Sequence, residues 1–173
     1  MSNKKVQAIS GVNPDQDTTM MTVYPSISAG FLGRLIGSAM EFLPVRILGL
    51  KPSNLIVGPI ALPFALLAYA LTKVTGTRYR LSNRVVQIWA SIGERRINEV
   101  ALADVDSIDV EEQSGQSFYK SADLVLRKGN GDVLMRMPGV VRADIFRRTI
   151  LKARDSQMRV AESMATIAAR QTA

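Results

Sequence analysis

Residues 55–74 read LIVGPIALPFALLAYALTKV, and this stretch decides how the rest of the chain can fold. It contains most of an uncharged run from Pro52 to Thr72 that is bounded by Lys51 and Lys73. About 20 helical residues, at about 1.5 Å each, cover the roughly 30 Å hydrocarbon core of a bilayer. A helix of this length in water needs a polar stripe, and this stretch has none. The sequence therefore predicts a transmembrane helix over residues 53–74.

Two prolines interrupt the same stretch. Pro59 and Pro63 lie inside the predicted helix, where each removes a hydrogen bond to the carbonyl four residues earlier. Membrane helices tolerate such prolines because neighbouring groups satisfy the freed carbonyls. We therefore expect a kinked helix, and a re-entrant hairpin is the alternative.

An amphipathic helix is predicted before it, over residues 29–43. Arg34, Ser38 and Glu41 fall on its polar face. The apolar residues follow a helical period and are Phe31, Leu32, Leu35, Ile36, Ala39, Phe42 and Leu43. We expect this helix to lie in the head-group plane, because a charge near the centre of a crossing helix costs roughly 2.5–3.5 kcal/mol. A second membrane crossing is the alternative.

Gly33 and Gly37 form a GxxxG pattern on this helix. Such spacing lets two membrane helices approach closely, so both glycines are candidates for helix packing. The alternative is that small residues only reduce the bulk of the polar face of a surface helix.

The composition excludes several classes of function. The 173 residues contain no His and no Cys, so a Ser-His-Asp triad, an imidazole metal ligand and a thiol nucleophile are all excluded. The acidic run over residues 104–112 begins like an EF-hand loop, but Asp109 stands where that loop requires glycine. We therefore expect no enzyme activity, no cofactor, no metal site and no small-molecule substrate.

The charge balance favours anionic partners. The net charge is +7, and lipid head groups are a usual partner for such a chain. Aromatic residues make up only 6% of the sequence, which is few for a protein that stacks nucleic-acid bases. The acidic run would also repel phosphates, so nucleic acid is not an expected partner.

After Gly76 the apolar residues alternate with a period of two, which indicates β-strands. Strands are predicted over residues 77–82, 84–90, 95–100, 118–127 and 133–137, and the stretch 102–110 also has an apolar side. Pro138-Gly139 is expected to close the sheet region. From Val140 the period becomes helical, and the apolar stripe consists of Ile145, Phe146, Thr149, Ile150 and Ala153. This helix is predicted to cover the strands, with Ile145, Phe146 and Ile150 against them.

Two segments carry a family resemblance: TRYRLSNRV at residues 77–85 and ALADVDSIDV at residues 101–110. They resemble the bacterial membrane-anchored pleckstrin-homology-like (PH-like) family, which reads Tyr-x-Leu-Thr-Asn/Asp-x-Arg at its first hairpin. Here Ser82 replaces the threonine and Arg84 directly follows Asn83. The resemblance implies an α+β membrane protein. Apolar helices would precede a seven-stranded β-sandwich or half-open barrel that a C-terminal α-helix caps. It also implies a non-catalytic module.

Two basic groups are candidate binding sites. Arg78, Arg80 and Arg84 surround the first hairpin, and relatives in fold bind inositol phosphates with basic residues near this turn, so we expect contacts with lipid head groups. The alternative is that these arginines only mark the cytoplasmic flank of the predicted span. The second group is expected to dock on a partner or on the membrane surface and consists of Arg142, Arg147, Arg148 and Lys152. Trp89 is interpreted as core or interface packing.

The sequence thus predicts four segments. They are a flexible polar tail (1–25), a membrane region (26–75), a PH-like β domain with its capping helix (76–155) and a helical extension or frayed tail (156–173). The predicted function is a membrane-anchored scaffold that recruits anionic lipid head groups or a protein partner, either another membrane protein or a second copy. An accessory subunit of a larger membrane complex is the alternative. We expect an integral protein of the cell membrane with its β domain in the cytoplasm.

Overall fold

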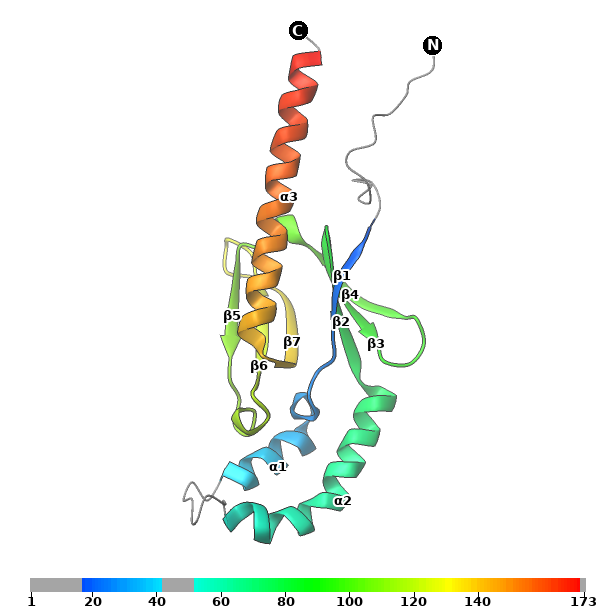
Figure 1. Ribbon diagram of the computed structural model, residues 1–173, viewed down its shortest axis with the longest axis vertical. Coiled ribbons are helices and arrows are strands. Elements are labelled where there is room, and N and C mark those ends of the chain that lie inside the picture. The colour runs from blue at the N-terminus through cyan, green and yellow to red at the C-terminus, as the bar shows by residue number, and fades with distance from the viewer. Residues whose placement is uncertain (1–16, 42–51, 172–173) are drawn as a thin grey trace.

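The computed structural model describes residues 17–41 and 52–171. Seven strands form two antiparallel sheets, and a long C-terminal helix packs against them, while two further helices form one end of the molecule (Figure 1). The α+β architecture, the seven strands and the capping helix are as expected. Predictions for residues 1–16, for the end of the helix expected over 29–43, and for residues 172–173 lie outside the described residues.

Sheet A is a four-stranded meander. Its strands, in spatial order, are β1 (Thr19–Val23), β2 (Thr77–Ser82), β3 (Val85–Ala90) and β4 (Arg96–Ala101). The alternation of β2 and β3 places Tyr79, Leu81, Val86 and Ile88 in the core, as a period of two requires. Arg78, Arg80, Gln87 and Trp89 therefore lie on the outer face of sheet A.

Sheet B follows through the short helix η2 (Leu102–Asp104). Its strands are β5 (Ser107–Glu111), β6 (Ser121–Arg127) and β7 (Val133–Val141), with the short helix η3 (Ser117–Tyr119) before β6. The expected end of the sheet at Pro138-Gly139 is wrong, because β7 continues to Val141. The register between β6 and β7 shifts there, so the two residues form an irregularity within the strand that a proline and a glycine accommodate.

Strand β1 corrects the predicted domain boundary. Residues 19–23 were expected in a flexible tail, but they pair with β2 in antiparallel register from Thr19–Ser82 to Val23–Tyr79. Pro25 then bridges to Val140 in sheet B, so this segment joins both sheets. The β domain therefore begins before the helices rather than after them. Its sequence, TMMTV, is too short and has no clear alternation of polar and apolar residues, so it does not predict a strand. Its partner β2 follows two helices later in the chain.

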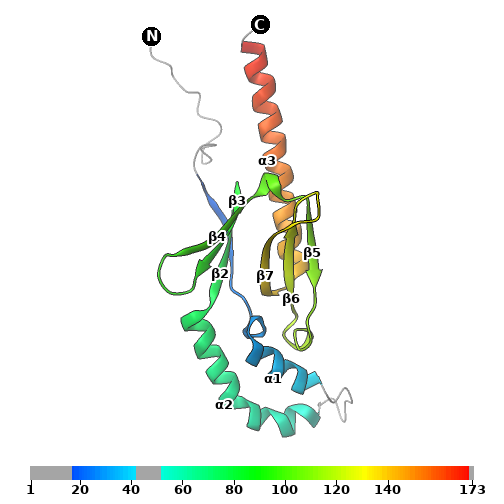
Figure 2. The same ribbon diagram turned by 180° about the vertical axis from the view of Figure 1, so that it is seen from behind.

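Helix α3 (Ala143–Gln171) covers the core with its first half. Ala143, Phe146, Ile150 and Ala153 are buried between the two sheets. Ile145, which was expected to share this role, is 49% exposed because it lies one residue, or about 100°, from Phe146 on the helix. The second half projects beyond the sheets (Figures 1 and 2), and Met158, Val160, Met164 and Ile167 are half exposed there.

Helix α1 (Phe31–Glu41) confirms the helix predicted in this region. A Cβ atom added to Gly33 would lie 1.9 Å from the Ile27 carbonyl oxygen of the preceding turn η1 (Ile27–Ala29), and one added to Gly37 would lie 2.0 Å from the Gly115 carbonyl oxygen. The two glycines thus lie in close contact with a turn and a loop, whereas the GxxxG pattern was considered as a contact between two helices. The polar side of α1 also faces the β domain, since the Ser38 hydroxyl lies 3.0 Å from that of Ser114.

Helix α2 (Pro52–Thr75) confirms the helix predicted over residues 53–74. It contains Pro59 and Pro63 and bends near its middle (Figures 1 and 2), which is the expected kink. Each limb of about 12 residues is about 18 Å long, shorter than the roughly 30 Å of a hydrocarbon core. Within residues 17–41 and 52–171, no helix combines the length and apolar character needed to cross a bilayer. The predicted transmembrane span is therefore not confirmed.

The Tyr79 hydroxyl links the two sheets by a hydrogen bond. Its ionisation makes the free energy of unfolding fall at alkaline pH. It donates a hydrogen bond to the Pro138 carbonyl oxygen at 2.8 Å, and burial raises the pKa of Tyr79 to about 12. The folded state favours the neutral phenol, so this contribution is complete below the unfolded pKa of about 10 and is lost as the pH rises through about 12.

We predict that wild type loses stability relative to Tyr79→Phe across this window in urea titrations. Tyr24→Phe, at an exposed tyrosine, is the control, and parallel pH profiles for wild type and Tyr79→Phe would contradict the prediction.

Candidate functional site

The end of the molecule formed by α1 and α2 exposes many large apolar side chains. Ile36 and Met40 of α1 pack against Ala65 of α2, which holds the two helices together. The outward side chains are between 44% and 71% exposed and are Phe31, Leu35, Leu62, Phe64, Leu66, Leu67, Tyr69, Leu71 and Val74. Exposed large apolar side chains in such numbers are typical of membrane or protein contacts. We call these nine residues the apolar end.

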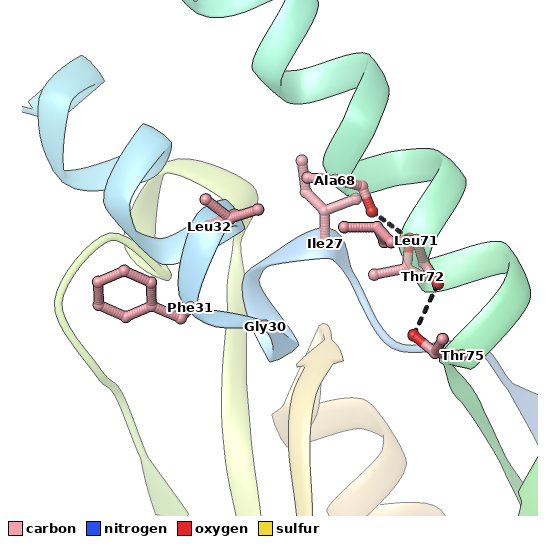
Figure 3. A pocket seen from close by; sticks show the side chains of 9 residues that line it. Ile27, Gly30, Phe31, Leu32, Ala68, Leu71, Thr72 and Thr75 are labelled. Carbon is pink, nitrogen blue, oxygen red and sulfur yellow. Dashed lines mark hydrogen bonds between the residues drawn. The ribbon is translucent and has the colours of Figure 1, made fainter.

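An apolar cleft of about 220 Å³ lies between η1, the start of α1 and the C-terminal part of α2. Ile27 and Ala68 face each other across it, whereas Phe31 points away from α2 (Figure 3). The hydroxyls of Thr72 and Thr75 donate to carbonyl oxygens of their own helix, at 3.1 Å to Ala68 and 2.9 Å to Leu71 (Figure 3). The hydroxyl groups of these two threonines therefore offer no free hydrogen-bond donor to the cleft.

The outer face of sheet A joins two of the predicted arginines to Trp89. The guanidinium carbon of Arg78 lies 5.8 Å and that of Arg80 4.8 Å from the centroid of the indole ring, within the range of a cation–π contact. The Nε atoms of both arginines are buried and have no hydrogen-bond partner within the described chain. We call these three residues the Arg–Trp cluster.

A hydrogen-bonded chain orients the indole ring. Trp89 Nε1 donates to Gln87 Oε1 at 2.8 Å, and Gln87 Nε2 donates to Glu99 Oε2 at 2.7 Å. Gln87 is only 5% exposed, so its amide has little freedom. Glu99 also pairs with Arg96, so its charge is balanced by an arginine outside the cluster. Arg78 and Arg80 are left with two positive charges and no ion pair among the residues described.

Arg84 does not join this cluster. Strand β2 begins two residues after α2 and runs away from it, and its six residues cover about 20 Å. Arg84 follows at the far end, where the neighbouring Asn83 N–H donates to the Thr18 carbonyl oxygen at 3.2 Å. The sequence grouped three arginines by proximity along the chain, whereas the strand separates Arg84 from the other two.

The basic residues at the start of α3 lie beside a second cleft, of about 480 Å³. Arg142 and Arg148 line it together with Lys120, whereas Arg147 and Lys152 are exposed but are not among its lining residues. Asp144 and Glu112 line the same cleft, so it is not uniformly basic. Lys120 was not predicted from the sequence as a residue of this site. Its unusual feature is a φ of 51°, which is a property of the folded backbone rather than of the sequence.

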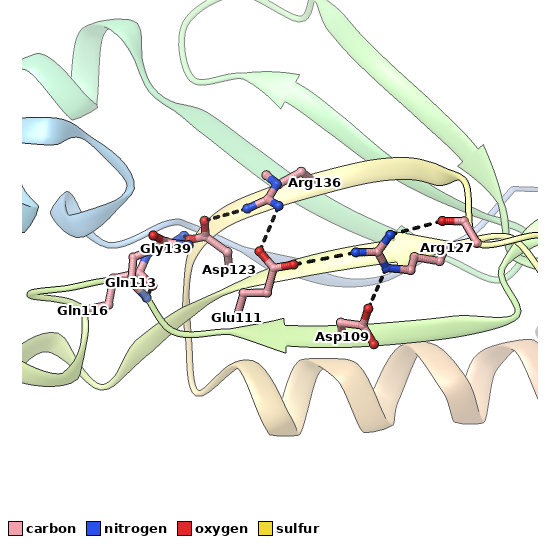
Figure 4. Close-up of polar contacts among 9 residues, drawn as sticks. Asp109, Glu111, Gln113, Gln116, Asp123, Arg127, Arg136 and Gly139 are labelled. Atoms are coloured by element: carbon pink, nitrogen blue, oxygen red, sulfur yellow. Dashed lines mark hydrogen bonds and ion pairs between the residues drawn. The ribbon is translucent and has the colours of Figure 1, made fainter.

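The outer face of sheet B carries the predicted acidic residues in ion pairs. Arg127 Nε lies 2.6 Å from Asp109 Oδ2, and Arg136 Nη2 lies 2.8 Å from Glu111 Oε2 (Figure 4). Buried Asp123 continues this network and accepts from Gln116 Nε2 at 2.6 Å and from the Gly139 N–H at 3.0 Å (Figure 4). Among the described residues, no group of carboxylates is placed to hold a metal ion.

Comparison with known proteins settles the family. The model of the family described as Bacterial PH domain matches residues 26–154. The chain belongs to this family. Neither the search of curated proteins nor the search of solved structures gave a match. The family matches the PH-like resemblance seen in the sequence.

The matched range shows which parts belong to the bacterial PH domain unit. It includes η1, α1 and α2 as well as strands β2 to β7, so the apolar end is part of the unit. Strand β1 and the projecting half of α3 fall outside it.

Sequence reasoning assigned Trp89 to packing and missed Gln87. Both lie on the outer face of this bacterial PH domain, and a period of two already separates them from Val86 and Ile88. The alternation that places Gln87 and Trp89 on one face was therefore present in the sequence. The contact between Trp89 and the two arginines, however, requires the pairing of β2 with β3, in which Arg78 is opposite Trp89 and Arg80 is opposite Gln87.

Proposed function

We propose that this bacterial PH domain protein docks on a membrane through its apolar end and holds its β domain against the lipid head groups as a non-catalytic binding module. The observation that carries the proposal is the set of nine exposed apolar side chains on α1 and α2. Each half-exposed leucine or phenylalanine that enters hydrocarbon contributes about 1 kcal/mol, so several together are sufficient for stable attachment. The protein acts in this proposal at the cytoplasmic face of the cell membrane.

The charges near the apolar end support the same orientation. Lys73 lies on α2 with its amino group 5.5 Å from the centroid of the Tyr69 ring, an arrangement typical of the interface between hydrocarbon and head groups. Arg78 and Arg80 follow on β2. Basic residues at this depth each contribute about 1 kcal/mol of attraction to an anionic leaflet.

The apolar residues of α2 provide the test. We predict that Leu67→Asp lowers binding of the full chain to protein-free vesicles of phosphatidylcholine and phosphatidylglycerol by at least about tenfold in flotation, since a carboxylate placed in hydrocarbon is costly. The matched control is Ile167→Asp. Leu67 and Ile167 are both 51% exposed, but Ile167 belongs to the C-terminal half of α3, which projects at the opposite end of the molecule from α1 and α2 (Figures 1 and 2).

Equal flotation of both variants and wild type would contradict membrane docking through α2. Absence of wild-type binding to protein-free vesicles, combined with retention in native membranes, would instead support the alternative, an accessory subunit that is held by another membrane protein. The projecting half of α3 favours that alternative as a second candidate, because its half-exposed apolar residues offer a helix face to a partner.

A further inference from the structure

One row of residues runs along the whole of α3, although the sheets cover only its first half. Its members follow one another at alternating spacings of three and four residues and are Phe146, Ile150, Ala153, Gln157, Val160, Met164 and Ile167. The first three are buried in the core, whereas the last three are between 51% and 55% exposed. This spacing is that of the contact positions of a coiled coil. We call the row the α3 seam.

The projecting half of α3 carries its part of the seam without a cover from the described chain. Arg154 donates hydrogen bonds to the carbonyl oxygens of Val105 at 3.0 Å and Asp106 at 2.9 Å, which holds the helix where it leaves the β domain. From Met158 to Arg170, every side chain whose burial is described is exposed. Isolated helices of about 12–15 residues are marginal in water. We therefore expect another helix to cover this part of the seam.

The residues beside the seam favour a second copy of the same helix. The positions that flank the seam of a coiled coil select partners through their charges, and around Gln157–Met164 they are the uncharged Ser156, Ala161 and Ser163. Glu162 lies on the opposite side of the helix from the seam, two residues from both Val160 and Met164. Two identical helices can therefore face each other there without bringing like charges together.

The direction of α3 determines how two copies can be arranged. The projecting half lies at the opposite end of the molecule from α1 and α2 (Figures 1 and 2). When two copies dock on one membrane through their apolar ends, both α3 helices point away from the lipid and pair in parallel. An antiparallel pair would turn one of the two apolar ends away from that membrane. In a parallel pair, each residue of the seam faces the same residue of the second copy.

We infer that two copies of this protein pair in parallel through the projecting halves of α3, with Val160, Met164 and Ile167 at the centre of the contact. The parallel direction rests on the membrane docking proposed above, whereas the seam itself does not. The uncovered part of the seam is only about two heptads long, shorter than the seam of most independent coiled coils. Confinement on a membrane raises the effective concentration of the copies, so docking strengthens the pairing.

Introduced cysteines test the pairing, because the chain has no cysteine of its own. A disulfide needs Cα atoms about 4.4–6.8 Å apart, which a parallel seam provides between identical residues. The full chain is oxidised mildly on vesicles of phosphatidylcholine and phosphatidylglycerol. We expect Val160→Cys to form at least about fivefold more linked dimer than Glu162→Cys, the control on the opposite side of the helix. Equal linkage at the two positions would overturn the inference.

The same variants distinguish the other possible partners. In an antiparallel pair Val160 faces Met164 of the second copy, so a mixture of Val160→Cys and Met164→Cys would link in preference to either variant alone. That result would overturn the parallel arrangement. In cells that express the chain, linkage of Val160→Cys to a polypeptide of another mass, in place of the homodimer, would overturn pairing between copies. It would support the accessory-subunit alternative instead.

Two methionines provide a matched test of the seam. Met164 and Met158 are 54% and 56% exposed, but Met158 lies outside the seam. In the Val160→Cys background we expect Met164→Asp to lower the amount of linked dimer at least about fivefold, and Met158→Asp to leave it unchanged. Circular dichroism shows whether both variants keep their helices. Equal effects of the two substitutions would overturn the inference.

Docking and pairing can fail separately. Linkage of Val160→Cys is therefore also measured in a mild detergent at high protein concentration, where pairing does not require vesicles. Preferential linkage there, with no binding of wild type to vesicles, would contradict only the docking. Vesicle binding without preferential linkage in either medium would contradict only the pairing. Ile167→Asp is expected to lose the pairing but to keep its flotation at low protein-to-lipid ratios, because each copy has its own apolar end.

Discussion

Replacing Phe146 by alanine lowers the free energy of unfolding by about 3–5 kcal/mol, the usual cost of removing a buried phenylalanine. Phe146 is 1% exposed and belongs to the core that both sheets and α3 share. The cavity left by the ring lies where α3 crosses the core, so neighbouring strands cannot close it without moving the helix. Urea unfolding of the full chain in a mild detergent, followed by circular dichroism, measures the loss.

Ile145→Ala is the matched control, because Ile145 is the next residue of the same helix and is 49% exposed. We expect a loss below about 1 kcal/mol. The sequence pattern treated the two residues as equivalent parts of one apolar stripe. Similar losses for both variants would mean that α3 does not cover the core with the Phe146 side.

Replacing Asp123 by alanine is expected to lower the free energy of unfolding by about 2–5 kcal/mol. The Asp123 carboxylate is the acceptor for Gln116 Nε2 and for the Gly139 N–H, and a buried donor that loses its acceptor costs about 1–3 kcal/mol. Gly139 has a φ of +66°, and its carbonyl oxygen accepts from the Ser26 N–H at 2.8 Å. The change therefore also weakens the contact between sheet B and the segment that follows β1.

Asp109→Ala is the control for a carboxylate on the same face of sheet B. Asp109 pairs with Arg127, but its side chain is 49% exposed, and exposed ion pairs contribute at most about 1 kcal/mol. Both variants remove one negative charge, so a difference between them isolates the buried hydrogen bonds. A smaller loss for Asp123→Ala than for Asp109→Ala would show that the network around Gly139 is not needed for folding.

Several elements could be predicted because local sequence contains the cause. Strand β2 was predicted with its observed bounds, Thr77–Ser82, because a strict alternation of polar and apolar residues is typical of a β-strand and not of a helix. Helices α1 and α2 were predicted from apolar spacing and length. The turn between β6 and β7 contains Asn130-Gly131, a dipeptide typical of hairpin turns, and Gly131 has the positive φ that such a turn needs.

Other features depended on residues that are far apart in the chain. Strand β1 has no strong pattern of its own and is a strand because the edge of β2 is open to it. Gly33 and Gly37 were recognised as close-packing residues, but their partners, η1 and the loop at Gly115, are not implied by a GxxxG pattern. The candidate site also divides in this way: Arg78 and Arg80 were named from the sequence, whereas their shared contact with Trp89 and the separation of Arg84 were not.

The sequence by itself determined the periodic elements, the apolar character of the region before the β domain and the positive charges at its edge, because these depend only on the order of side chains. The tertiary structure alone decided that a strand from before the helices completes sheet A, that α2 exposes its apolar residues beside α1, and that one indole ring contacts two arginines. Each of these results from contacts between segments separated by whole helices or strands, and no local pattern specifies which segments meet.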